Sequence, residues 1–149
     1  MKLFQIEEPD GSPVDPDAPG VAIGVDLSGA YAEVALSVGG NAAILTDREG
    51  FALDLAVPGL EASTDDWQRL FEGARLRAER ALAQPATHAV VAIAVPAAPA
   101  IVERLGRAAE AAGLRLLELM PDAVANPEQP RACAAAIRAE DLAPRPSVP

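Results

Sequence analysis

The sequence predicts one α/β domain built on a mixed five-stranded sheet of order 3-2-1-4-5, with helices on both faces. Apolar residues first alternate with a period of two over residues 21–46, and then recur at helical spacing from about residue 63. Uninterrupted apolar runs and further helical patterns follow. Because crossovers between parallel strands are right-handed, the later strands should add on the far side of the first strand.

The first half of the domain reads as a meander. Strands are expected at 21–27, 32–38 and 42–46, and Gly39-Gly40 forms a two-residue hairpin turn because glycine accepts the positive φ that such turns need. Residues 51–57 show a short alternation that is typical of a further strand.

The second half alternates helices with strands. Ser63 or Thr64 caps a helix that Pro85 ends. A fully apolar strand is expected at 89–95, and the next helix runs from Pro99 to its C-terminal Gly113. A strand at 114–119 and an Ala-rich helix at 128–140 complete the domain. Aromatic residues make up only 3% of the chain, so we expect four of them to anchor an Ala-, Val- and Leu-rich core: Tyr31, Phe51, Trp67 and Phe71.

Composition divides the chain into three parts. Residues 1–20 are expected to form an N-terminal arm and linker, because residues 8–20 are rich in Pro, Asp and Gly. Residues 21–142 form the domain, and 143–149 a disordered tail.

Charge narrows the classes of partner. The formal net charge is −10 and Lys2 is the single lysine, which argues against nucleic acid and against an anionic membrane surface. No apolar run is long enough to span a bilayer, and the N-terminus lacks the apolar region of a secretory signal. We therefore expect a cytoplasmic protein.

Cys133 and His88 are the single residues of their types. An internal disulfide is impossible, and a thiolate zinc site is nearly excluded. We expect Cys133 to be a small apolar residue on its helix and His88 to have a structural or solvent-facing role.

Asp26 is the candidate functional residue. It ends an apolar strand and precedes the small-residue turn Ser28-Gly29-Ala30. A carboxylate in this position can hold Mg²⁺ through water, while the amides of Ser28, Gly29 and Ala30 face phosphate. The alternative is structural, with Asp26 accepting hydrogen bonds from the amides of its own turn.

The expected strand order is the ribonuclease-H-like topology, which is also that of one lobe of the actin-like ATPases. Within it, the chain resembles the first lobe of DnaK-type heat-shock chaperones, and most closely the HscA type that serves iron–sulfur cluster assembly. The resemblance covers about residues 1–50 and 65–126. It is carried by Leu3–Pro9, Ile23–Leu27, Val91–Ala97 and Ala108–Leu114.

The resemblance implies a Mg-ATP or Mg-ADP site, with Asp122 in the place of the glutamate that orients the attacking water. It also implies an iron–sulfur scaffold or co-chaperone partner. The departures are large, because Ser28-Gly29-Ala30 replaces the family's Gly-Thr-Thr, no lysine occurs between Phe51 and Ala62, and the second lobe is absent. We therefore expect an ATPase-deficient lobe.

Two other classes remain open. Ribonuclease-H-like nucleases place converging carboxylates around two metals, and Asp26, Glu118 and Asp122 are available here. The other class is a non-catalytic module that binds a protein partner or forms a homodimer, in which case no cofactor is needed.

Overall fold

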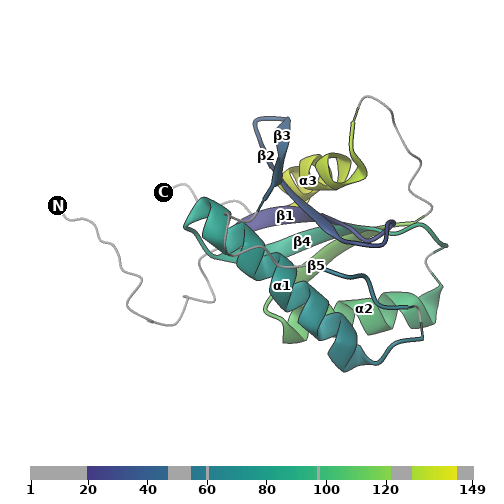
Figure 1. Ribbon diagram of the computed structural model, residues 1–149. Helices are drawn as coiled ribbons and strands as arrows, with labels where there is room; N and C mark the ends of the chain where they lie inside the picture. The colour runs from purple at the N-terminus through teal and green to yellow at the C-terminus, as the bar shows by residue number, and fades with distance from the viewer. Residues whose placement is uncertain (1–19, 47–54, 60, 97, 122–128, 144–149) are drawn as a thin grey trace, which may run out of the picture.

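The computed structural model describes residues 20–46, 55–59, 61–96, 98–121 and 129–143 (Figure 1). The described elements, in chain order, are β1 (Val21–Asp26), β2 (Glu33–Val38), β3 (Asn41–Leu45), α1 (Thr64–Leu82), β4 (Ala86–Ala92), α2 (Pro99–Ala111), β5 (Arg115–Met120) and α3 (Arg131–Leu142).

The sheet confirms the predicted topology. Its order is β3-β2-β1-β4-β5, with β3, β2 and β1 antiparallel and β1, β4 and β5 parallel. Helices α1 and α2 cover one face, and α3 covers the other (Figure 1). The domain therefore has the α/β fold of ribonuclease-H-like proteins and of a single actin-like ATPase lobe.

The larger core lies under α1 and α2. Ile23 and Val25 of β1 point into it and are fully buried, as is Phe71 of α1. Trp67 is buried beside them, and Ser63 starts α1 as predicted, since its side chain accepts a hydrogen bond from Asp66 N. Burying these large side chains stabilises the contact between the two helices and the sheet.

The opposite face is packed from very small side chains. Gly24 lies on it, and a Cβ built at Gly24 would fall 2.7 Å from Ala136 Cα and closer still to Ala136 N and Ala132 O. The backbone of α3 therefore rests directly on β1. The buried positions of α3 are correspondingly small: Ala132, Cys133, Ala135, Ala136 and Ala139.

Several sequence-based boundaries were wrong. Strand β4 begins three residues before the predicted 89, because its extent follows its pairing with β1 from Val21↔Ala86 to Asp26↔Ala92. Helix α3 starts at Arg131, after Pro130 at its N-cap. Tyr31 is 61% exposed rather than a core anchor, because it follows the turn at the end of β1, where Ala32 takes the buried position.

Other expectations lie partly or wholly outside the described residues. Of the strand predicted at 51–57, the structure describes 55–57, in which Ala56 forms a single bridge with Tyr31. Phe51, the arm up to residue 19 and the tail from residue 144 are not described. None of the described helices is both long enough and apolar enough to cross a membrane.

The contact at Gly24 gives the first prediction. Gly24→Ala should lower the free energy of unfolding by about 1–3 kcal/mol, because α3 must move away from β1 to admit the methyl group. Urea denaturation followed by circular dichroism measures this change. Gly59→Ala is the matched control, since a Cβ there meets nothing within 4 Å, and it should change stability by less than about 1 kcal/mol. Equal stability of the two variants would contradict the close packing.

Candidate functional site

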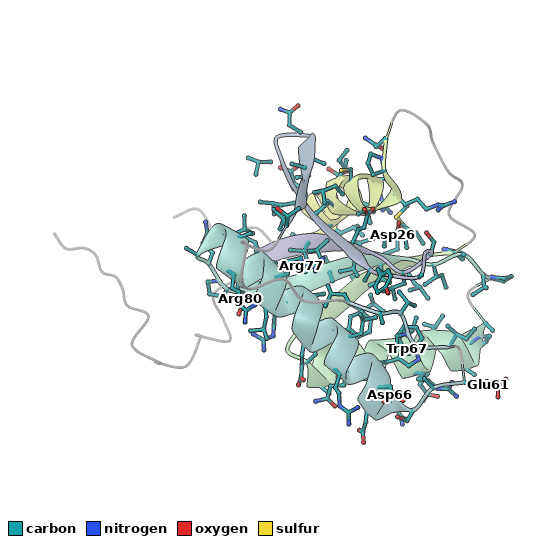
Figure 2. The ribbon with its side chains drawn as sticks, in the orientation of Figure 1. Asp26, Glu61, Asp66, Trp67, Arg77 and Arg80 are labelled. Atoms are coloured by element: carbon teal, nitrogen blue, oxygen red, sulfur yellow. The ribbon has the colours of Figure 1, made fainter. Side chains whose placement is uncertain are left out.

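Asp26 is the last residue of β1 and points to the α3 side of the sheet (Figure 2). It pairs in register with Ala92 of β4, which in turn pairs with Met120 of β5. The carboxyl ends of the three parallel strands therefore share this edge, where open α/β sheets usually carry their sites. Asp26 is only 9% exposed.

One oxygen of Asp26 is used within its own turn. Oδ1 accepts hydrogen bonds from Ser28 N at 2.9 Å and from Ser28 Oγ at 2.6 Å. This is the structural role that the sequence offered as the alternative. Within the described chain, Oδ2 has no hydrogen-bond partner, so this buried carboxylate keeps one acceptor available.

Arg131 joins this turn from the far end of the sequence. Its Nη1 donates a hydrogen bond of 2.9 Å to Ser28 Oγ, although 103 residues separate the two. Arg131 is the first residue of α3, which lies against β1. Sequence reasoning missed it, because an arginine after a proline at the start of an Ala-rich helix carries no motif.

The rest of the turn is exposed to solvent on one side and is held by main-chain hydrogen bonds on the other. Gly29 and Ala30 are exposed, and their N–H groups form no hydrogen bond with another described residue. Ala30 O accepts from Val57 N at 2.9 Å, while Ala32 N donates to Leu55 O at 2.7 Å. The predicted phosphate-facing amides of Gly29 and Ala30 are thus held in place and accessible, and their binding of phosphate stays a prediction.

The oxygen ligands available at this edge suit Mg²⁺ that is bound through its water molecules. Asp26 Oδ2 is a free buried acceptor, and Mg²⁺ commonly keeps most of its waters while contacting one or two carboxylates and a phosphate. No cluster of three or more His, Cys, Asp or Glu able to hold a metal occurs among the described residues. The Arg131 guanidinium adds positive charge next to the turn, which favours an anion there over a bare cation.

A second carboxylate faces α3 beside Asp26. Glu33 of β2 pairs directly with Asp26 in the antiparallel register, so both side chains project from the same face. Burial and, secondarily, the negative charge of Glu33 raise the pKa of the Cys133 thiol. Cys133 is therefore a protonated, buried residue of the α3 packing, in agreement with its predicted apolar role.

The structure describes two of the three acids of the nuclease alternative, Asp26 and Glu118. Glu118 lies in β5, two residues before the Met120 that shares the register of Asp26 and across the intervening β4. Its carboxylate pairs with Arg138 of α3 at 2.9 Å. Asp122, proposed both for the nuclease and for water activation, lies outside the described residues.

Comparisons with known proteins identify a structural resemblance and no family. No family model matches the chain, and no curated protein matches it. The crystal structure of the ethanolamine utilization protein EutJ from Carboxydothermus hydrogenoformans is similar over 72% of this chain, with 21% identity and a TM-score of 0.41. The match spans 39% of that protein's length.

A cavity of about 330 Å³ lies at the opposite end of the parallel strands, among Glu72, Pro85–Thr87, Ala111–Gly113 and the pair Arg75–Glu79. The two members of that pair are engaged structurally. Arg75 Nε donates to Ala112 O at 2.7 Å, and Glu79 Oε2 accepts from Ala86 N at 3.0 Å. These contacts join α1 to the end of α2 and the start of β4.

His88 lies close to this end, with Nδ1 2.7 Å from Thr87 Oγ1. Burial and, to a lesser degree, Arg115 lower the pKa of His88. Its contacts agree with the structural role predicted for it.

The surroundings of Cys133 give a pH-dependent prediction. Iodoacetamide should alkylate native Cys133 at least tenfold more slowly than the urea-unfolded chain at pH 8, because the thiolate is disfavoured and covered. In Glu33→Gln the midpoint of the rate against pH should fall towards the ordinary value without reaching it, since burial is the larger cause. An unchanged midpoint in Glu33→Gln would mean that Glu33 does not act on Cys133.

Proposed function

We propose that this chain is an ATPase-deficient nucleotide-binding lobe of the HscA and DnaK type, which binds the phosphates of Mg-ADP or Mg-ATP without hydrolysing them. Its role would be in iron–sulfur cluster assembly or protein folding. The observation that supports the proposal most is the connected set Asp26–Ser28–Arg131 at the carboxyl end of β1.

This set supplies what a phosphate requires. Arg131 brings a guanidinium to the turn, and guanidinium groups bind phosphate through charge-assisted hydrogen bonds. The exposed residues Gly29 and Ala30 follow Ser28 in the same turn and supply two further amides. Arg131 thus places a cation near the turn in a chain without the lysine that the chaperone resemblance leads one to expect.

Binding without turnover is proposed because a group that the resemblance assigns to phosphoryl transfer is missing from this chain. Phosphoryl transfer needs the phosphate, the metal and the attacking water to be positioned together. The resemblance assigns part of this to a lysine, and residues 51–62 contain none. When bound, the metal would neutralise phosphate charge, and the one group proposed to reach it is Asp26 Oδ2 through water.

Isothermal titration calorimetry with ADP and ATP in Mg²⁺ tests this proposal. Wild type should bind both, and Arg131→Ala should weaken binding about 10- to 100-fold, because a charge-assisted hydrogen bond is lost. Asp26→Ala should remove the Mg²⁺-dependent part of the affinity. Phosphate release measured alongside should not exceed the rate without protein.

Arg69→Ala is the control for net charge, because Arg69 is 76% exposed on α1, which covers the face of the sheet opposite to α3 and Arg131. It should leave affinity unchanged. Unfolding of each variant by circular dichroism separates lost binding from lost structure. Absence of binding to folded wild type, or tighter binding by Arg131→Ala, would overturn the proposal, the second result because Arg131 would then block the turn.

The chaperone side of the proposal is tested separately with purified iron–sulfur scaffold protein and co-chaperone. Biolayer interferometry with the immobilised full chain should detect binding of one of them, with and without Mg-ADP. Nucleotide binding without either partner would retain the lobe and remove its assignment to iron–sulfur assembly.

A further inference from the structure

Strand β3 forms one edge of the sheet (Figure 1). Its inner side pairs with β2 from Val34↔Leu45 to Val38↔Asn41, and no strand of the described chain pairs with its outer side. An unpaired edge presents a row of main-chain donors and acceptors to other chains.

The hairpin register fixes which groups face outward. Gly39 and Gly40 form a two-residue turn with φ of 62° and 84°, and the pair that flanks such a turn, Val38 and Asn41, exchanges its hydrogen bonds across the hairpin. Hydrogen-bonded pairs alternate along the ladder. The main-chain N–H and C=O groups of Ala42 and Ile44 therefore point away from β2.

We propose that the outer edge of β3 pairs antiparallel with the same edge of a second copy of this chain. A two-fold axis through Ala43 places Ala42 of one copy opposite Ile44 of the other, so that the two residues exchange main-chain hydrogen bonds. Ala43 then faces its own counterpart. The two sheets become one continuous sheet, and each copy uses the same groups, as a two-fold interface requires.

The composition of β3 supports a second copy as the occupant. Asn-Ala-Ala-Ile-Leu has no charged residue and no proline, although natural edges are usually guarded by such residues. Two molecules of net charge −10 repel each other. Because β3 carries no charged side chain, this repulsion is weaker when the two copies approach through β3. The exposed Ala43 is small enough for close strand contact at the axis.

The neighbouring surface adds apolar area to this contact. Val38 follows Val34 and Leu36 on the side of the sheet that carries α1, yet it is 68% exposed, because the β2–β3 hairpin projects beyond α1 (Figure 1). On the other side, Glu140 of α3 accepts hydrogen bonds from Gly39 N and Gly40 N. The hairpin is thus held in shape while its outer edge stays available.

Sedimentation of wild type over a concentration series is the first measurement. The expected result is a reversible dimer of twice the 15.3 kDa monomer mass. Ala43→Asp should weaken the dimer on the order of tenfold or more, because two carboxylates would face each other at the axis. Ala43→Lys should act alike, and an equimolar mixture of the two variants should restore dimers as mixed pairs.

Ala81→Asp and Ala81→Lys are the matched controls, since Ala81 is an exposed alanine on α1; both should dimerise as wild type does. A wild type that stays monomeric at every concentration overturns the proposal. A dimer that survives Ala43→Asp also overturns it, because another surface would then join the copies. The proposal is independent of nucleotide binding, and each can fail alone.

Discussion

The direct contact between the backbone of α3 and Gly24 of β1 is the constraint on which this structure depends. It requires a residue without a side chain in the central strand and a helix whose buried face is alanine and one cysteine. Close approach of this kind replaces bulky apolar burial with dense packing of small groups. The buried residues on the α3 face are thereby mostly small, whereas the largest buried side chains, among them Trp67 and Phe71, lie on the other face.

The position of α3 also connects two distant turns. At its start, Arg131 donates a hydrogen bond to Ser28 in the turn that follows the carboxyl end of β1. Near its end, Glu140 accepts hydrogen bonds from Ser37 Oγ and from the amides of the β2–β3 turn. One helix therefore organises both the candidate site and the hairpin whose edge is proposed to pair, and any shift of α3 on β1 would disturb both.

On the opposite face of the sheet, the side chains of Arg75 and Glu79 likewise join the ends of separate elements. Arg75 of α1 donates to Ala112 O at the end of α2 and pairs with Glu79, which accepts from the first amide of β4. These bonds satisfy main-chain groups at element ends. They engage Arg75 and Glu79 of the cavity there. At the Asp26 end of the sheet, by contrast, Asp26 Oδ2 and the amides of Gly29 and Ala30 have no hydrogen-bond partner among the described residues.

The sequence by itself determined the strand and helix order, the hairpin at Gly39-Gly40 and the position of Asp26, because periodicity, glycine conformation and strand ends are local properties. It did not determine the ends of β4, since a uniformly apolar run hides where pairing stops. Only the tertiary structure decided that Arg131 meets Ser28, that Glu118 is paired with Arg138, and that Tyr31 is exposed. The two contacts of α3 depend on how α3 packs against Gly24, and the exposure of Tyr31 depends on the buried position that Ala32 takes after the β1 turn. No spacing along the chain encodes the contact of Arg131 with Ser28, which are 103 positions apart.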